Sequence, residues 1–168
     1  MDINERCIEI LESCGQPQQV IDHCKAVAEV SHALALALNA KGFSLDAELC
    51  RRGGLLHDIR RTEKFHSIRG MLALFEQGLR EEGRIVGAHM GDFIDTDRIA
   101  EKEVVYIADK ITKGTGRVSV AERYARSLEK FKGDEAGTKA AYDRRDQSVK
   151  LAEYIEGILG CPLHEFDL

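Results

Sequence analysis

The sequence predicts an all-α fold, a bundle of about six to eight helices. Apolar residues recur at intervals of three and four, the spacing of one helix face, over most of the chain. Only 2 prolines interrupt the 168 residues, and residues that cap helices stand at the ends of the periodic segments. This length suits one domain. We expect one spanning residues 1–168, with a core over about 18–125 and C-terminal helices at 119–160 packed on it.

Residues 2–14 form the first predicted helix. Its start has the arrangement of a capping box. Ile8 and Leu11 are expected to face the core, and Gly15 follows the end.

The second predicted helix covers residues 17–40 and carries two histidines. His23 lies one turn from Val20 and Val27, so it borders the apolar stripe. His32 is nine positions further, which at about 100° per residue places it on the opposite face. We therefore expect His23 near the core and His32 in solvent. The alternative for His23 is a half-buried side chain that bonds a backbone group.

The next predicted helix begins near Asp46 and runs into the adjacent pair His57 and Asp58. Two glycines, Gly53 and Gly54, lie inside it at a cost of roughly 1 kcal/mol each relative to alanine. Their use would be close approach of the preceding helix, and a frayed helix end is the alternative.

Three further helices are predicted between residues 66 and 113. Their ranges are His66–Leu79, Arg84–Met90 and Ile99–Lys113. The stripe expected to be buried in the first is Ile68, Leu72 and Phe75. His66 and His89 stand at helix ends, where a cap or surface role is the alternative to ligand binding. Asp109 borders an apolar stripe, and burying it unpaired would cost several kcal/mol. Its partner is a lysine, an arginine or a metal.

After residue 119 the pattern predicts helices without chemistry. Ser119 and Glu122 form a capping box for a helix to about Lys132, and a longer helix ends near Leu159 after a turn at 133–137. Three further features of this part are Tyr124, Tyr142 and the charged residues 143–146. We expect them to contribute packing and a solvated face, and the alternative is a role at the edge of the site or in an oligomer.

Composition excludes several classes of protein. The net charge of -5 makes nucleic acid an unlikely partner, although a local basic patch could bind phosphate. No apolar run approaches the ~18 residues of a membrane span, and the start lacks the form of a signal peptide. Five cysteines without C-x-x-C spacing indicate reduced thiols in a cytoplasmic protein. Cys24 lacks an evident oxyanion site, which disfavours a nucleophilic role.

Five short segments carry the histidines and aspartates in a specific order. They read Asp-His-Cys-Lys-Ala-Val-Ala at 22–28, Gly-Leu-Leu-His-Asp-Ile at 54–59, His-Ser-Ile-Arg-Gly at 66–70, Ile-Val-Gly-Ala-His-Met at 85–90 and Tyr-Ile-Ala-Asp-Lys at 106–110. This set, over roughly residues 18–125, resembles the HD-domain metal-dependent phosphohydrolases. It looks closest to the small HD proteins related to the diadenosine tetraphosphate hydrolases and to HD modules beside nucleotidyltransferase-like domains. The resemblance implies an HD-domain helical bundle with a metal site between helices.

The resemblance also implies the metal ligands. A first ion would be bound by His23, His57, Asp58 and Asp109. A second would be bound by His66 and His89, with Asp58 bridging. The dinuclear members of the HD-GYP type carry two consecutive histidines where this chain has His89 and Met90, so one or two ions remain open. Imidazole and carboxylate ligands suit iron, manganese, nickel, cobalt or zinc, with magnesium as a further option.

The predicted function is hydrolysis of a phosphate ester or anhydride, on a nucleotide or another small phosphorylated metabolite. A bound metal lowers the pKa of its water toward ~7 and so supplies hydroxide, and Asp58 could accept the proton. We expect four cations to contact phosphate: Arg60, Arg61, Lys64 and Lys110. The alternative for Arg60 and Arg61 is a solvated helix end. The alternatives are symmetric cleavage of diadenosine tetraphosphate and a non-catalytic metal- or nucleotide-binding regulatory module. A homo-oligomer is an open option.

Overall fold

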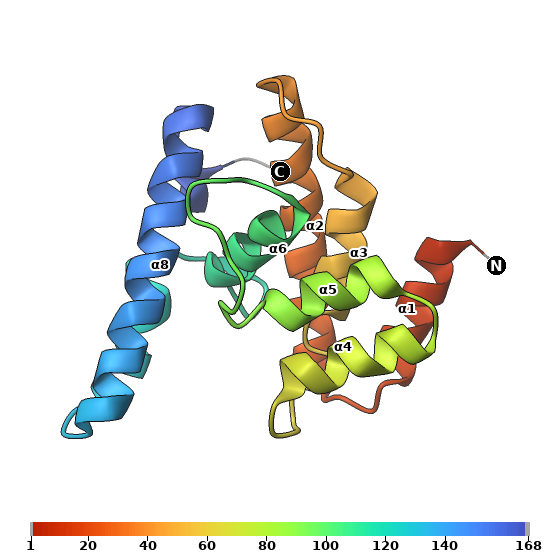
Figure 1. Ribbon diagram of the computed structural model, residues 1–168, viewed down its shortest axis with the longest axis horizontal. Helices are drawn as coiled ribbons and strands as arrows, with labels where there is room; N and C mark the ends of the chain where they lie inside the picture. The colour runs from red at the N-terminus through yellow and green to blue at the C-terminus, as the bar shows by residue number, and fades with distance from the viewer. Residues whose placement is uncertain (1, 167–168) are drawn as a thin grey trace.

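The computed structural model describes residues 2–166, and they form an almost wholly helical protein (Figure 1). Eight α-helices occur in this range, which confirms the predicted all-α class and number of helices. They are α1 (Ile3–Ser13), α2 (Gln18–Ala40), α3 (Ala47–Leu56), α4 (His66–Glu76), α5 (Arg80–Ala88), α6 (Glu101–Lys110), α7 (Val120–Lys130) and α8 (Glu135–Leu159). The short elements are β1 (Thr112–Lys113), β2 (Gly116–Arg117) and the 3-10 helix η1 (Leu163–Glu165).

Helices α2, α3 and α6 form the centre of the molecule. The α4–α5 pair lies on one side of them and α8 on the other (Figure 1). One apolar cluster joins α2 and α6 to α8 through residues such as Leu34, Ile107 and Leu151. A second cluster joins α1, α2 and α3 to the α4–α5 pair through residues such as Leu11 and Leu74. Burial on both sides holds the central helices in fixed positions.

The two glycines of α3 allow neighbouring helices to approach closely, as predicted. A Cβ atom on Gly54 would lie 2.7 Å from the Ala28 Cα atom of α2. A Cβ atom on Gly53 would lie 2.8 Å from a side-chain carbon of Ile85 in α5. Glycine at these positions therefore sets how near α3 comes to α2 and α5.

Helix α5 begins at Arg80, four residues earlier than predicted. Gly83, which precedes the predicted start, lies inside the helix, where a Cβ atom would meet the Phe75 ring at 2.6 Å. Its lack of a side chain allows α4 and α5 to pack closely. The glycine marks a helix contact and not a chain break.

The predicted buried stripe of α4 is wrong. Ile68 and Leu72 are 39% and 51% exposed, whereas Ser67, Gly70 and Leu74 face the interior. A Cβ atom on Gly70 would lie 2.9 Å from Val86, so the small residues face α5. A pattern based on large apolar residues cannot detect a face that small residues form.

The same error occurs in α1. Ile8 is 40% exposed, while Cys7 and Leu11 are fully buried.

Helix α6 ends at Lys110 and not at Lys113 as expected. Residues 112–117 instead form an antiparallel hairpin in which Thr112 pairs with Arg117. Gly114 at its tip has a φ of 60°, which favours glycine. Helix α8 also begins earlier, at Glu135, within the expected turn. Within residues 2–166 no helix is both long and apolar enough to cross a membrane.

Candidate metal centre

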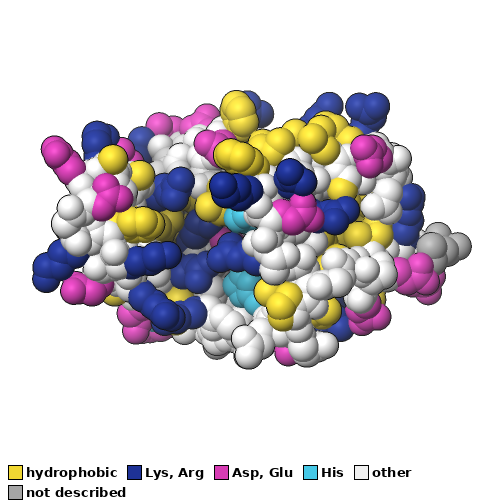
Figure 2. All heavy atoms as spheres, turned by 90° about the horizontal axis from the view of Figure 1, so that it is seen from below, with side chains coloured by type: hydrophobic (Ala, Val, Ile, Leu, Met, Phe, Trp, Pro, Cys, Tyr) yellow, Lys and Arg dark blue, Asp and Glu magenta, His cyan; other side chains and the backbone are white. Residues whose placement is uncertain are grey.

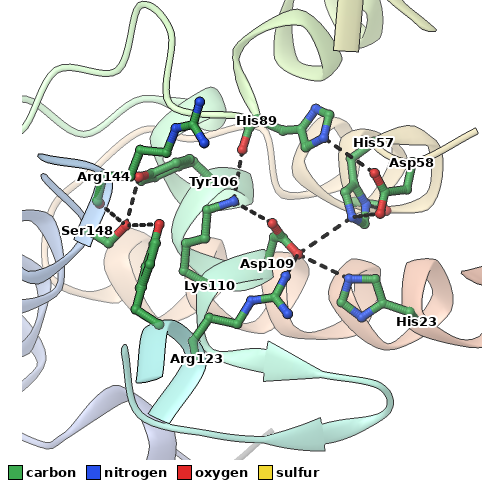
Figure 3. Close-up of polar contacts among 12 residues, drawn as sticks. His23, His57, Asp58, His89, Tyr106, Asp109, Lys110, Arg123, Arg144 and Ser148 are labelled. Atoms are coloured by element: carbon green, nitrogen blue, oxygen red, sulfur yellow. Dashed lines mark hydrogen bonds and ion pairs between the residues drawn. The ribbon is translucent and has the colours of Figure 1, made fainter. Parts of the chain in front are cut away.

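Six predicted ligands converge where α2, α3, α4, α5 and α6 meet (Figure 3). Most of them stand at helix ends. His57 and His89 are the C-cap residues of α3 and α5, and His66 is the first residue of α4. Asp109 lies one residue before the end of α6. Residues far apart in the sequence therefore reach one point.

The first group of ligands surrounds the Asp109 carboxylate. The Nε2 atom of His23 lies 3.0 Å from Asp109 Oδ1, and the Nε2 atom of His57 lies 3.7 Å from the same oxygen. Asp58 Oδ2 lies 3.5 Å from His57 Nε2. The ligand atoms of His23, His57 and Asp58 lie within 4.8 Å of one another, near enough to hold one ion, and Asp109 lies beside the two histidines.

The second group uses the other oxygen of Asp58. The Nε2 atoms of His66 and His89 each lie 3.4 Å from Asp58 Oδ1. They are 3.1 Å from one another. Asp58 thus directs one oxygen to each group of histidines.

Backbone carbonyls fix the orientation of three of the imidazole rings. Because a carbonyl only accepts a hydrogen bond, the ring nitrogen facing it carries the hydrogen. The Nδ1 donors and their acceptors are His23 with Gly114 O at 2.9 Å, His57 with Gly54 O at 2.8 Å, and His89 with Val86 O at 2.6 Å. In each neutral ring the Nε2 lone pair therefore points into the site, as a metal ligand requires.

Two buried atoms indicate that the residues fit a cation. Within residues 2–166, His57 Nε2 and Asp58 Oδ1 are buried without any hydrogen-bond partner. Leaving such a group unpaired costs about 1–3 kcal/mol. A divalent ion between the imidazole nitrogens and the carboxylate oxygens would satisfy both atoms. The donor set contains no thiolate and suits a first-row transition metal.

The protonation states also suit metal binding. Burial lowers the pKa of His57 to about 4, so the ring is neutral at pH 7. Burial alone would raise the pKa values of Asp58 and Asp109, but neighbouring cationic and hydrogen-bonding groups hold both well below the usual range. The chief neighbours are the His57 ring for Asp58, since that ring is cationic at the low pH where the carboxyl group titrates, and the Lys110 ammonium for Asp109. Burial opposes protonation of His23, yet its contacts with Asp109 raise its pKa.

Comparison with known protein families matches residues 20–114 to the HD domain. The chain belongs to the HD-domain superfamily of metal-dependent phosphohydrolases. This confirms the resemblance inferred from the five sequence segments.

Two curated relatives are similar to this HD protein. An uncharacterized protein of Methanocaldococcus jannaschii is 33% identical over 135 residues, which cover 69% of this chain and 79% of the relative. A tRNA (cytidine(56)-2'-O)-methyltransferase of Thermoplasma volcanium is 25% identical over 177 residues. That match covers 95% of this chain and 48% of the methyltransferase, so the HD protein corresponds to about half of that relative. No solved structure matches the chain significantly.

The predicted cation Lys110 is held inside the HD site. Its ammonium lies 2.6 Å from Asp109 Oδ2 and donates to the carbonyl oxygen of His89 at 3.0 Å. It also lies 4.8 Å from the centre of the Tyr106 ring. These contacts join the ends of α5 and α6 and orient the Asp109 carboxylate (Figure 3).

The other predicted cations differ in position. Arg61 lies 3.5 Å from Asp58 Oδ2 and lines a cleft beside the ligands. Arg60 is exposed and pairs with Glu63 at 3.1 Å. Lys64 is exposed and makes no ion pair with any residue in 2–166. Arg61 and Lys110 are therefore the two of the four that the fold brings to the site.

The sequence analysis missed a cation from α7. Arg123 lies 3.4 Å from Asp109 Oδ1 and lines the same cleft as Arg61 (Figure 3). Arg144 of α8 also lines it, which favours the edge-of-site alternative for residues 143–146. The capping box at Ser119 predicted the start of α7, but no local pattern indicates which helix face meets the ligands.

His32 and Cys24 lie outside the ligand set. His32 is partly buried rather than fully in solvent and lies 3.1 Å from Glu48. Cys24 is completely buried, and this burial raises the pKa of its thiol. Neither residue belongs to the two ligand groups.

Proposed function

We propose that this HD protein hydrolyses a phosphate ester or anhydride, on a nucleotide or another small phosphorylated metabolite, with two divalent ions. The observation that carries the proposal is the position of Asp58. Its two oxygens face separate groups of Nε2 atoms, so one carboxylate would join two ions. The first ion would be held with His23, His57 and Asp109, and the second with His66 and His89. When bound, such ions lower the pKa of a coordinated water and offset charge on phosphoryl oxygens.

The protein's own residues would bind and orient the substrate. Arg61 and Arg123 both line the cleft, Arg61 next to Asp58 and Arg123 next to Asp109. Guanidinium groups bind phosphate oxygens in a bidentate manner, which would place phosphorus beside the ligand groups. Lys110 would hold Asp109 in position. We assign Asp58 to metal binding rather than to proton transfer. Both its oxygens face histidines, and its pKa is far below the usual range.

A panel of substrates tests this proposal. Protein loaded with manganese, iron, cobalt, nickel or zinc would be assayed on nucleotides, dinucleoside polyphosphates and a chromogenic phosphodiester. We expect turnover with at least one metal. Asp58→Ala should lose both metal and turnover. Asp97→Ala is the matched control, because Asp97 is exposed and its carboxylate forms an ion pair only with Lys150 among the described residues.

The competing function is a regulatory module that binds a metal or nucleotide without turnover. It predicts stoichiometric metal and no hydrolysis of any compound in the panel. Symmetric cleavage of diadenosine tetraphosphate predicts adenosine diphosphate as the sole product from that substrate. The products formed would therefore separate the three alternatives.

A further inference from the structure

The cleft beside the metal ligands continues along α7. The first part, about 200 Å³, is lined by Asp109, Lys110 and Arg123 together with Arg61 and Arg144. A second part, about 380 Å³, is lined by Lys113, Arg123, Arg126, Ser127 and Lys130. Both parts share Arg123 and Ser127, so they adjoin. We call the second part the α7 groove.

Helical spacing explains why the lining residues of the α7 groove share one face. Arg123, Arg126 and Lys130 follow one another at intervals of three and four, so their side chains project to the same side. From Arg123 to Lys130 the helix rises about 10 Å. The groove is therefore long enough for more than one phosphate group, and its far end offers cations to a second anion.

Of the four cations that line the α7 groove, Arg123 pairs with Asp109, and the other three have no carboxylate partner among residues 2–166. Lys113, Arg126 and Lys130 form no ion pair with any residue in 2–166. The two carboxylates of α7 are engaged elsewhere, since Glu122 bonds Ser119 and Glu129 pairs with Lys132.

A protein with a net charge of -5 therefore gathers unpaired cations beside its metal centre. Figure 2 shows lysine and arginine side chains around the histidines on one hollowed face.

We infer that the α7 groove is a second phosphate-binding site, and that the ligand is a small molecule with a chain of several phosphates. This inference rests on the proposed function, with one phosphate at the metal ligands, Arg123 between the sites, and further phosphates on Arg126 and Lys130. Lysine acts as a flexible point charge, which suits successive phosphates. No aromatic side chain lines the groove, although single-stranded nucleic acid is commonly bound by stacking on aromatic rings. The lining thus favours a polyphosphate over RNA.

The test uses tripolyphosphate and orthophosphate as probes, with binding to the metal-loaded protein measured by calorimetry. We expect tripolyphosphate to bind more tightly than orthophosphate. The double variant Arg126→Ala/Lys130→Ala should weaken tripolyphosphate binding about tenfold or more. Orthophosphate affinity and metal content should change less than about twofold, because neither residue contacts a metal ligand. The matched control is Lys132→Ala/Lys139→Ala, which removes two exposed cations that have carboxylate partners.

Three results would overturn the inference. The first is equal affinity for tripolyphosphate and orthophosphate, and the second is an equal loss of tripolyphosphate affinity in the two double variants. The third is an Arg126/Lys130 variant that loses binding of single-stranded RNA but keeps its affinity for tripolyphosphate. Turnover is not needed for this readout. An inactive protein with the expected binding pattern would contradict the proposed hydrolysis and support the second site. Active protein whose tripolyphosphate binding is unchanged in the Arg126/Lys130 variant would support the proposed hydrolysis and contradict the second site.

Discussion

Replacement of Gly54 by alanine should destabilise the protein, although alanine favours a helix interior by about 1 kcal/mol. The added methyl would lie 2.7 Å from the Cα atom and 2.8 Å from the nitrogen of Ala28. Carbon atoms in contact are about 3.5–4 Å apart, so α3 would have to move about 1 Å from α2. Overpacking costs about 1–3 kcal/mol, and rigid backbone neighbours favour the upper end. The net loss is then about 2 kcal/mol, which lowers the Tm by about 4–8 °C.

The same displacement should weaken metal binding. Helix α2 carries His23 and α3 carries His57, and both direct Nε2 toward Asp109 Oδ1. Metal–ligand distances tolerate changes of only about 0.2 Å. A shift of about 1 Å should therefore reduce metal content measured by elemental analysis after dialysis, in addition to the lower Tm of the metal-free protein.

Gly157→Ala is the matched control. Gly157 is an exposed position inside α8, and no atom lies within 4 Å of the Cβ that alanine would add. This variant should gain about 1 kcal/mol and melt about 2–4 °C higher, with unchanged metal content. Our account of the α2–α3 contact fails if Gly54→Ala melts as high as the unaltered protein and retains its metal.

Three further predictions concern the site. Removing metal with a chelator should lower stability, because an ion at 100 times its Kd contributes about 2.7 kcal/mol; an unchanged Tm on adding metal back would contradict the ligand assignment. Lys110→Met should destabilise the metal-free protein by about 3 kcal/mol in urea, since Asp109 loses its nearest cation. The exposed control Lys64→Met should stay within about 0.5 kcal/mol, and equal stabilities would refute the role of Lys110. Cys24 should react with a thiol reagent only after unfolding, because burial raises the pKa of its thiol and covers it. The partly exposed Cys14 and Cys161 should react first. Rapid labelling of Cys24 in the native protein would contradict this and show that α2 opens.

The sequence predicted which candidate ligands lie together better than it predicted the surfaces around them. His23 could be placed because it borders the long apolar stripe of α2, and the order of the five segments supplied the rest. The exposed positions of Ile68 and Leu72 could not be predicted from the apolar pattern, because α4 packs through Gly70 and Ser67. Small residues carry little hydrophobic signal, yet they allow the closest helix contacts.

Arg123 illustrates a different limit. Its position depends on how α7 is oriented after the hairpin β1–β2, and the first strand of that hairpin was predicted as the end of a helix. Nothing local distinguishes Arg123 from the exposed Arg126 three residues later. The sequence therefore identified residues whose chemistry is specific, and it missed those whose role depends only on where a helix lies.

Helix ends explain why the ligands can be both buried and oriented. The last carbonyls of a helix lack partners within it, and Gly54 and Val86 provide such carbonyls in α3 and α5. His57 and His89 donate Nδ1 to them from three residues further along. One hydrogen bond thus completes the helix end and directs Nε2 into the site. The C-terminal ends of α3, α5 and α6 meet there, and their partial negative charges favour a cation. The backbone and the ligand side chains consequently both favour a cation at this site.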